Sequence, residues 1–373
     1  MKIIILTPLP FWHPATQELI DTIRKYNISI TALDVFLGIG LNENNELVNY
    51  LPLGLKGIFA KLYLKFFRSP FIKKYTKDAD ILDVHFVDQG YKQLLNNLPN
   101  KIICTLFGSD LFRTSDKQKK SQIALFKKAN QIVLSKNMAD YFVKHFPGNE
   151  TKLFYSQYGS NRIAKIISEK ANLSKNELRK HFSIPEGKIT ITCGYNNKPE
   201  QQHLLIIKEL TLLNKKDKSK IILLFPMTYG DVEKSYIKKV EEAVRKSGID
   251  FKLFLERFTE DDLVKMRLVS DVTINTQTTD ALASSIKEAM VAGDIMLIGE
   301  WLPYDIYSEL GVFYRKIQFS NLRTSIEETI ENFDDLIAKS AVNETLIKNC
   351  ATWEVLIQNW INLYTKTYSE CKQ

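Results

Sequence analysis

Two carboxylates, Asp280 and Glu288, are separated by seven residues in the segment TTDALASSIKEAMVAG. The segment follows a short apolar run at Asp271–Asn275, and its spacing predicts a helix that ends near Gly293. Asp280 would lie in the loop before the helix or in its first turn. A helix rises about 1.5 Å per residue, which puts Glu288 about two turns further along. Carboxylates accept hydrogen bonds from vicinal hydroxyl groups. The pair is therefore suited to holding two sugar rings of one ligand, or it forms the solvated acidic start of an amphipathic helix.

Composition and charge restrict the class of protein. The chain has 373 residues, which suits two domains, and its 45% apolar and 25% charged residues are typical of a folded protein. A formal net charge of +8 indicates an anionic partner, which is nucleic acid, an anionic membrane surface or a phosphate-bearing ligand. The sequence contains neither zinc-finger spacing nor the aromatic signature of an RNA-recognition module. We therefore expect no nucleic-acid partner.

The cysteines and the N-terminus indicate a cytoplasmic protein. No two cysteines form a CxxC pair, and two of the four end apolar, strand-like runs, which is typical of reduced core thiols; they are Cys104, Cys193, Cys350 and Cys371. No run of about 18 apolar residues predicts a transmembrane helix. The apolar start, MKIIILTPLP, is too short for a signal peptide and meets Pro8 and Pro10, so we expect a first buried strand there.

Short apolar runs alternate with helical segments along the whole chain, which predicts βαβ units and parallel sheets. The first series of predicted strands comprises Lys2–Leu6, Ile28–Val35, Ala79–Val87, Lys101–Gly108 and Ala129–Lys136. A polar, lysine-rich stretch through Lys180 follows, and then a second series comprises Lys188–Gly194, Lys220–Met227, Phe251–Glu256, Asp271–Asn275 and Asp294–Gly299. The pattern predicts two doubly wound α/β domains, with ligands at the carboxyl ends of the strands.

The segment Tyr50–Tyr75 is unusual because it mixes leucine, isoleucine and phenylalanine with six basic residues and contains no acidic residue. Such a segment is suited to an anionic lipid interface, with its apolar face toward the lipid and its cations at the headgroups. The alternative is an ordinary domain helix with solvated lysines.

Several segments, taken in order, resemble a GT-B glycosyltransferase of the family 4 type. The entry to the donor domain of that family resembles ELRKHFSIPEGKITITCGYN, and its E-x7-E helix resembles DALASSIKEAMVAG. Its final helix resembles TWEVLIQNWINLY, and the GSD loop of its acceptor domain resembles TLFGSDLFR. GYNNKPEQQH with PMTYGDVEKSYIKKV also resembles the 4-acetamido-4,6-dideoxygalactose transferases of bacterial surface polysaccharides.

This resemblance implies a GT-B fold, in which two Rossmann-like doubly wound domains face a central cleft. Residues 1–172 would form the acceptor-binding domain, residues 173–348 the donor-binding domain, and residues 349–373 a helix crossing back to the first. The implied activity is transfer of a sugar from a nucleoside diphosphate sugar, of the UDP or dTDP type, to a hydroxyl group of a glycan acceptor. We expect a lipid-linked acceptor, a role in surface polysaccharides such as O-antigen or capsule, and a peripheral position on the inner face of the cell membrane.

Two alternative functions are compatible with the same pattern. One is a UDP-sugar epimerase of the same fold, which acts without an acceptor. The other is a non-catalytic protein that binds a nucleotide sugar or a glycan. Analysis of the products formed without an acceptor distinguishes the epimerase from a transferase. Binding of the donor without turnover distinguishes the binding protein from a transferase.

The resemblance also implies roles for individual residues in donor binding. Glu288 would accept hydrogen bonds from the ribose, and Asp280, which replaces the first glutamate of the motif, would hold hydroxyl groups or an amide of the transferred sugar. Tyr195 stands where the family usually has an arginine, so other cations must neutralise the diphosphate; the candidates are Lys198, Arg257 and Lys287. The full set of expected donor-binding residues is Gly194, Tyr195, Asn196, Lys198, His203, Tyr229, Arg257, Asp280, Ser284, Ser285 and Glu288.

Catalysis of sugar transfer requires either a general base for the acceptor hydroxyl group or a substrate-assisted route. His13, His85 and Asp110 follow predicted strands of the first domain and are the candidates, although each is also suited to a structural role. Asp110 lies in the GSD loop and is the first choice for contact with the acceptor. The five histidines are scattered, so we expect neither a metal site nor a cofactor.

Overall fold

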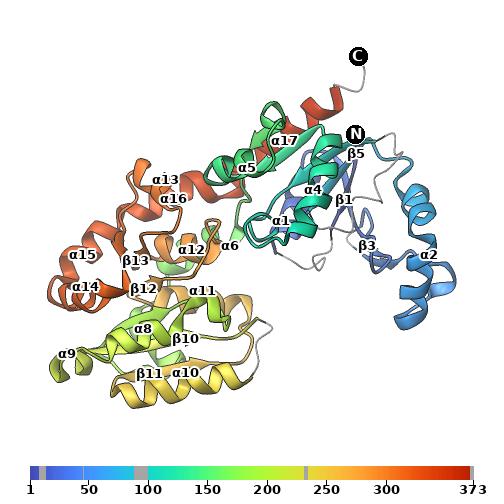
Figure 1. The fold of residues 1–373 in the computed structure, drawn as a ribbon. Helices are drawn as coiled ribbons and strands as arrows, with labels where there is room; N and C mark the ends of the chain where they lie inside the picture. The colour runs from blue at the N-terminus through green and yellow to red at the C-terminus, as the bar shows by residue number, and fades with distance from the viewer. Residues whose placement is uncertain (8–13, 45, 88–99, 231–233, 370–373) are drawn as a thin grey trace. The chain divides into compact units, whose positions relative to one another are not determined.

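The structure of the chain is a computed structural model and describes residues 1–7, 14–44, 46–87, 100–230 and 234–369. The chain divides into two compact units (Figure 1). The first unit comprises Met1–Gly159 together with Trp353–Gln373, and the second comprises Ser160–Thr352. The C-terminal helix therefore belongs to the first unit.

The division between the units lies one helix earlier than residue 172, where the sequence places it. The helix α6 (Asn161–Lys170) packs on α11 (Glu260–Val269) and α12 (Ser284–Ala292) of the second unit. Ile163 and Ile166 on the apolar face of α6 are fully buried in that unit's core. Burial of this face fixes α6 to the second unit.

The first unit is built on an eight-stranded sheet with the order β4-β3-β2-β1-β5-β6-β7-β8. Its strands are β1 (Lys2–Leu6), β2 (Ser29–Asp34), β3 (Ile39–Leu41), β4 (Leu47–Asn49), β5 (Ile81–His85), β6 (Lys101–Thr105), β7 (Gln131–Leu134) and β8 (Leu153–Tyr155). All neighbouring strands pair in parallel except β3 and β4, which form an antiparallel edge. This edge is not predicted from the sequence, because strands of three residues have too little periodicity to detect.

Helices cover the sheet of the first unit, and the last of them completes its core. The helices are α1 (Pro14–Arg24), α2 (Gly57–Thr76), α3 (Ser109–Phe112), α4 (Asp116–Lys128), α5 (Ala139–His145) and α17 (Trp353–Ser369), with 3-10 turns at Pro52–Gly54, Lys136–Met138 and Glu150–Lys152. Trp360, Leu363 and Tyr364 of α17 are buried with Ile3 and Ile5 of β1. Aromatic residues at helical spacing therefore serve here as core residues.

The second unit contains a fully parallel six-stranded sheet with the order β11-β10-β9-β12-β13-β14. Its strands are β9 (Ile189–Cys193), β10 (Ile221–Pro226), β11 (Asp250–Phe254), β12 (Val272–Asn275), β13 (Ile295–Gly299) and β14 (Arg315–Ile317). Its helices are α6, α7 (Lys175–His181), α8 (His203–Leu210), α9 (Lys215–Lys220), α10 (Lys234–Ser247), α11, α12, α13 (Asp305–Glu309), α14 (Phe319–Glu331), α15 (Phe333–Ser340) and α16 (Val342–Ala351). Two hydrophobic clusters fill this unit. The predicted doubly wound α/β class is confirmed in both units.

Each sheet contains one point at which the strand order reverses. In the second unit the chain builds outward from β9 through β10 to β11, and later from β12 through β13 to β14, so β9 and β12 are neighbours at this switch point. In the first unit the corresponding neighbours are β1 and β5. The loops that leave the carboxyl ends of these strands diverge, which leaves room for a ligand.

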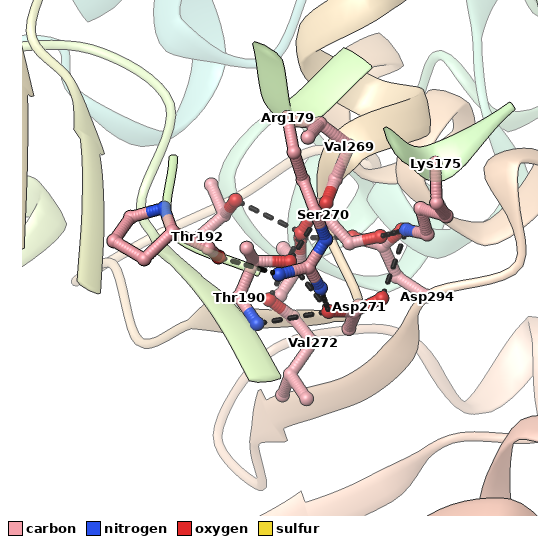
Figure 2. A network of polar contacts seen from close by, with 11 residues as sticks. Lys175, Arg179, Thr190, Thr192, Val269, Ser270, Asp271, Val272 and Asp294 are labelled. Carbon is pink, nitrogen blue, oxygen red and sulfur yellow. Dashed lines mark hydrogen bonds and ion pairs between the residues drawn. The ribbon is translucent and has the colours of Figure 1, made fainter. Parts of the chain in front are cut away.

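The opposite edge of the second sheet contains a buried polar network that spans the amino-terminal ends of β9, β12 and β13 (Figure 2). Asp271 accepts hydrogen bonds from the backbone N–H of Thr190 at 2.8 Å and from its hydroxyl group at 2.7 Å. Asp271 also pairs with Lys175 at 2.9 Å and Arg179 at 3.1 Å, both from α7. The network thereby fixes α7 to the sheet at the edge away from the switch-point loops.

Asp294, which precedes β13, is also buried in this network and accepts a hydrogen bond of 2.6 Å from the Thr273 hydroxyl group. Burial raises the pKa of Asp294 to about 6, although the hydrogen bond from Thr273 and the charge of Lys175 act against the rise. At neutral pH the folded protein therefore contains a buried carboxylate whose ionisation is less favourable than in the unfolded chain.

We expect the free energy of unfolding of the Asp294→Asn variant to increase, relative to that of the natural chain, as the pH rises. The pKa of an aspartate in an unfolded chain is about 3.9, so the stabilising contribution of protonated Asp294 is fully present below about pH 4. This contribution is lost as the pH rises through the folded-state pKa of about 6. The free energy of unfolding of the variant minus that of the natural chain should therefore increase by about 2 kcal/mol between about pH 4 and pH 7. Chemical denaturation across this range measures the difference, and a difference independent of pH contradicts the prediction.

Candidate functional site

The turn after β9 requires a glycine. Gly194 has a φ of +68°, and its N–H donates to the carbonyl oxygen of Ile274 in β12 at 3.1 Å. A Cβ atom at this position would lie 2.8 Å from Oε1 of Gln201 and 3.1 Å from Nε2 of His203. Both the backbone conformation and the close approach therefore exclude a side chain, and the turn joins the two strands of the switch point.

The next residues tie this turn to the end of β10. The N–H of Asn197 donates to the carbonyl oxygen of Tyr229 at 3.0 Å, and the N–H of Lys198 donates to Oδ1 of Asn196 at 2.9 Å. The Tyr229 hydroxyl group forms hydrogen bonds with the side chains of Asn196 and Ser285. The structure thus brings Asn196, Tyr229 and Ser285 together, whereas the Lys198 side chain is exposed.

His203 lies at the start of α8 and is fully buried. Its Nδ1 is 3.1 Å from the Tyr236 hydroxyl group. Burial lowers the pKa of His203 to about 4, although a hydrogen bond with the Asn196 backbone acts against this. The imidazole is therefore neutral at pH 7 and brings no positive charge to the Gly194 turn.

Glu288 is 0% exposed and lies at the centre of a charge cluster formed by three helices. Its Oε1 accepts hydrogen bonds from Nη1 of Arg162 at 2.8 Å and from the Ser284 hydroxyl group at 3.1 Å. Its Oε2 accepts from Nε of Arg267 at 3.1 Å. Burial alone would raise the pKa of Glu288, but the charges of Arg267 and Arg162 outweigh it and lower the pKa. Glu288 is therefore ionised, and three of its roughly four acceptor positions are occupied.

Asp280 lies in the loop between β12 and α12, where its carboxylate organises the approach to the helix. Its Oδ1 accepts from the backbone N–H of Ala283 at 3.0 Å. Its Oδ2 accepts from Nδ2 of Asn275 at 3.2 Å and from the Tyr304 hydroxyl group. Asp280 and Glu288 thus stand on either side of the first turn of α12, as the sequence predicts, and each has its own set of partners.

Two predicted cations lie away from the contacts of the charge cluster. Arg257 is exposed in the loop after β11. Lys287 precedes Glu288 but is buried, and burial lowers its pKa, although the charges of Cys350, Glu288 and Asp280 act against this. Among the described residues, neither side chain forms a hydrogen bond with the Gly194 turn.

In the first unit, His85 ends β5 and is fully buried in a polar network. Its Nδ1 is 3.1 Å from the Tyr158 hydroxyl group, and its Nε2 is 3.2 Å from Oδ2 of Asp83. Asp83 also accepts hydrogen bonds from the hydroxyl groups of Thr105 at 2.7 Å and Tyr364 at 2.8 Å. His85 therefore lies between Tyr158, which follows β8, and Asp83, which connects β5 to β6 and α17.

Asp110 joins the loops that follow β5 and β6. Its two carboxylate oxygens accept hydrogen bonds from the backbone N–H groups of Val87 at 2.9 Å and Phe107 at 2.8 Å. Burial raises the pKa of Asp110 to about 6, with these backbone hydrogen bonds opposing the rise. His13, the third candidate base, lies outside the described residues.

Several residues of the site are missing from the sequence-based set. Arg162 and Arg267 pair with Glu288, and Tyr304, Gln201 and Gln277 form hydrogen bonds around Asp280 and the Gly194 turn. Arg267 lies in the run VKMRLVS, where a basic residue among apolar positions of a helix predicts a buried carboxylate partner. Nothing local distinguishes Arg162 or the two glutamines from surface residues. Within the described residues, no group of three or more histidine, cysteine, aspartate or glutamate side chains is suited to hold a metal ion.

Solved structures with the same fold cover nearly the whole chain. A glycosyltransferase from Rickettsia africae is 13% identical, with 98% of each chain covered and a TM-score of 0.74. HepE from Anabaena in complex with UDP is 13% identical, with 98% of this chain and 100% of HepE covered and a TM-score of 0.72. Sucrose-phosphate synthase from Thermosynechococcus elongatus is 10% identical, with 99% and 100% covered and a TM-score of 0.75. No protein-family model matches the chain, and no curated protein matches it.

These likenesses show that the chain has the GT-B fold, which comprises two Rossmann-like α/β domains with parallel cores. The predicted fold class is therefore confirmed. The matched structures share 10–13% of their residues with this chain, so the likeness establishes the fold and leaves the substrate to be argued from the site.

We expect Gly194→Ala to destabilise the second unit more than Gly187→Ala does. Both glycines have a positive φ, +68° and +73°, so both substitutions cost about 1 kcal/mol of backbone strain. Only the alanine at position 194 meets side-chain atoms, because nothing lies within 4 Å of a Cβ atom at Gly187. Equal losses of unfolding free energy for the two variants, measured by denaturation, would show that the turn has room to adapt.

Proposed function

We propose that the protein is a glycosyltransferase that moves a sugar from a nucleoside diphosphate, of the UDP or dTDP type, to a hydroxyl group of a glycan. The observation that carries this proposal is the composition of the loops at the β9–β12 switch point. A glycine turn that excludes a side chain, a helix start with two serines and a buried carboxylate paired with two arginines lie together there. HepE, which has the same fold, has been solved with UDP and with UDP-glucose.

Arg267 is suited to neutralise the diphosphate in place of the arginine that Tyr195 replaces. It donates from Nε to Glu288, and among the described residues its two terminal nitrogens make no hydrogen bond. Burial raises the pKa of Tyr229, and the positive charge of Arg267 acts against this rise, so the guanidinium and the Tyr229 hydroxyl group interact electrostatically. The first amides of α12 and the guanidinium would hold an anion from two sides.

The chemistry of transfer explains why positive charge is needed there. The bond between the anomeric carbon and the diphosphate oxygen breaks, and the acceptor hydroxyl oxygen bonds to that carbon while its proton leaves. Negative charge grows on the departing diphosphate, and donors that are already fixed in place stabilise it most. Glu288 fixes Arg162 and Arg267, and it retains acceptor capacity for a ribose hydroxyl group. No step of this route needs a metal ion.

The base that takes the acceptor proton is sought among Asp110, His85 and His13. With a pKa raised to about 6 by burial, Asp110 titrates near the range useful for a general base. Its two oxygens already accept hydrogen bonds from backbone N–H groups, so an acceptor hydroxyl group would have to form an additional hydrogen bond with the same carboxylate. His85 would need to exchange its contact with Tyr158 or Asp83 for the acceptor.

The helix α2 supports a lipid-linked acceptor and a position on the inner face of an anionic membrane. Figure 1 shows α2 in light blue beyond β3 at the edge of its unit. Ile58, Phe59 and Phe66 on its outer face are 76%, 67% and 68% exposed. The opposite face, with Leu64 and Phe71, is buried. Exposed apolar side chains of this size mark a contact surface.

The charge around this apolar face is complementary to acidic headgroups. Residues 50–75, which include most of the helix, contain Lys56, Lys61, Lys65, Lys73 and Lys74, all exposed, and no acidic residue. Within the described residues no helix is long and apolar enough to cross a membrane. A surface-bound position on anionic lipid therefore fits α2 better than a spanning one does.

We expect one nucleotide of a panel of UDP, dTDP, GDP, CMP and ADP to raise the melting temperature of the natural chain. A ligand that binds only the folded state stabilises it by mass action. In Glu288→Gln the shift should fall, because the neutral amide no longer fixes the two arginines. Glu331→Gln, an exposed carboxylate on α14, is the matched control. The donor-site proposal fails if no nucleotide shifts the natural chain, or if Glu288→Gln keeps the full shift.

The protein is then incubated with sugar derivatives of the nucleotide that binds, with and without a glycan acceptor. The products distinguish a transferase from an epimerase and from a binding protein. Transfer requires a glycan acceptor, whereas a change of the sugar without acceptor would indicate the epimerase. Binding without turnover on any lipid-linked acceptor would indicate a binding protein.

We expect the natural chain to sediment with vesicles that contain phosphatidylglycerol and to remain free of vesicles of phosphatidylcholine alone. The double variant Phe59→Ser/Phe66→Ser should lose most of this binding, because each exposed ring contributes about 2 kcal/mol when it enters the lipid. Leu212→Ser, which removes an exposed apolar side chain from the second unit, should bind as the natural chain does. Equal sedimentation of the natural chain and the double variant excludes α2 as the lipid contact.

A further inference from the structure

A chain of three neutral polar side chains bridges the two switch-point loops of the second unit. The Tyr195 hydroxyl group donates to Oε1 of Gln277 at 3.1 Å, and Nε2 of Gln201 donates to the same oxygen at 3.2 Å. Tyr195 and Gln201 follow β9, and Gln277 follows β12. The three residues therefore cross the point at which ligands bind to folds of this kind.

The orientation of both amides follows from these contacts. The backbone N–H of Tyr195 donates to Oε1 of Gln201 at 3.3 Å, so the nitrogen of Gln201 faces away from that turn and toward Gln277. Because Oε1 of Gln277 accepts two hydrogen bonds, its amide is fixed with Nε2 on the other side. An amide nitrogen carries two donors.

The nitrogen of Gln277 has no partner. The residue is only 3% exposed, and within the described residues no acceptor lies in hydrogen-bond range of Nε2. The main chain around it is fixed, since the Gln277 carbonyl oxygen accepts from Nε1 of Trp301 at 2.8 Å. A buried donor that cannot turn toward another acceptor is costly unless a ligand satisfies it.

The side chains around this nitrogen are unsuited to a phosphate. Tyr195 and Gln201, whose side chains contact the Gln277 amide, are neutral, and among the described residues no charged side chain forms a hydrogen bond with Gln277. The arginines of the site instead pair with Glu288. A phosphate is favoured beside the arginines, whereas an uncharged oxygen is favoured beside Gln277.

We propose that Nε2 of Gln277 donates a hydrogen bond to an uncharged oxygen of the transferred sugar, either a hydroxyl group or the carbonyl group of an acylamino substituent. This inference rests on the proposed sugar-nucleotide donor. Tyr195 and Gln201 are positioning residues, which act by holding the Gln277 amide in this orientation. Gln277 would then contribute to selection of the sugar, and not to binding of the nucleoside diphosphate.

The test compares the affinity for a free nucleoside diphosphate with that for its sugar derivatives, by isothermal titration calorimetry. The probes are UDP, UDP-glucose, UDP-N-acetylglucosamine, dTDP and dTDP-glucose. Gln277→Glu retains an oxygen for Tyr195 and Gln201 and replaces only the donor, and Gln277→Met is a second variant of similar length without charge. Gln358→Met, on the exposed side of α17, is the control.

We expect both Gln277 variants to bind the free diphosphate within about twofold of the natural chain, which also shows that they are folded. Affinity for the preferred sugar derivative should fall by about 10-fold to 100-fold, as expected for a lost hydrogen bond with its partner left unpaired. Tyr195→Phe should cause a smaller fall, and the control none.

Three outcomes overturn the inference, and they are distinguishable. If the natural chain binds no probe, the proposed donor site fails and the role of Gln277 fails with it. If it binds UDP or dTDP but binds none of their sugar derivatives more tightly, the proposed donor site is retained and the role of Gln277 is wrong. If the Gln277 variants keep the sugar-dependent gain, some other residue recognises the sugar.

Discussion

Burial of the Glu288 carboxylate is the constraint on which the second unit depends. An unpaired carboxylate in the interior would cost several kcal/mol, so its partners must be present whenever the unit is folded. The partners come from two other helices, Arg162 of α6 at 2.8 Å and Arg267 of α11 at 3.1 Å. One charge therefore determines the packing of three helices. It also explains the position of the unit boundary before α6, because α6 cannot move away without leaving Glu288 with a single cation.

The same cluster gives the switch point two chemically different parts. The arginines and the start of α12 form a region suited to an anion, and the amides of Gln201 and Gln277 with the Tyr195 hydroxyl group form a neutral region. A nucleotide sugar has the same division, because its diphosphate is charged and its sugar is not. A free nucleotide, a phosphorylated protein or a nucleic acid would leave the neutral region without a matching group. The site is thus more specific than its single acidic motif suggests.

The sequence allowed much of the fold to be predicted, because the parallel strands are apolar runs and helices follow them with clear periodicity. Gly194 and the Asp280–Glu288 pair were also found correctly within their elements, since a glycine turn and a helix start have local signals. The partners of Glu288 were not predicted, because Arg162 is 126 residues away in the chain and resembles a surface residue there. The role of Gln277 was equally hidden. A glutamine has no local pattern, and only the fixed orientation of its neighbours shows that one of its donors is free.

Tyr195 stands where the resemblance noted in the sequence would place an arginine, so the expected cations must be checked against the structure. The expected substitutes, Lys198, Arg257 and Lys287, are respectively exposed, exposed and buried with a lowered pKa. The structure instead presents Arg267 from α11, where Glu288 orients it. The Tyr195 hydroxyl group instead donates to Gln277. Under the proposed function, the cation for the diphosphate would come from α11, while Tyr195 would position the neutral amide that we propose contacts the sugar.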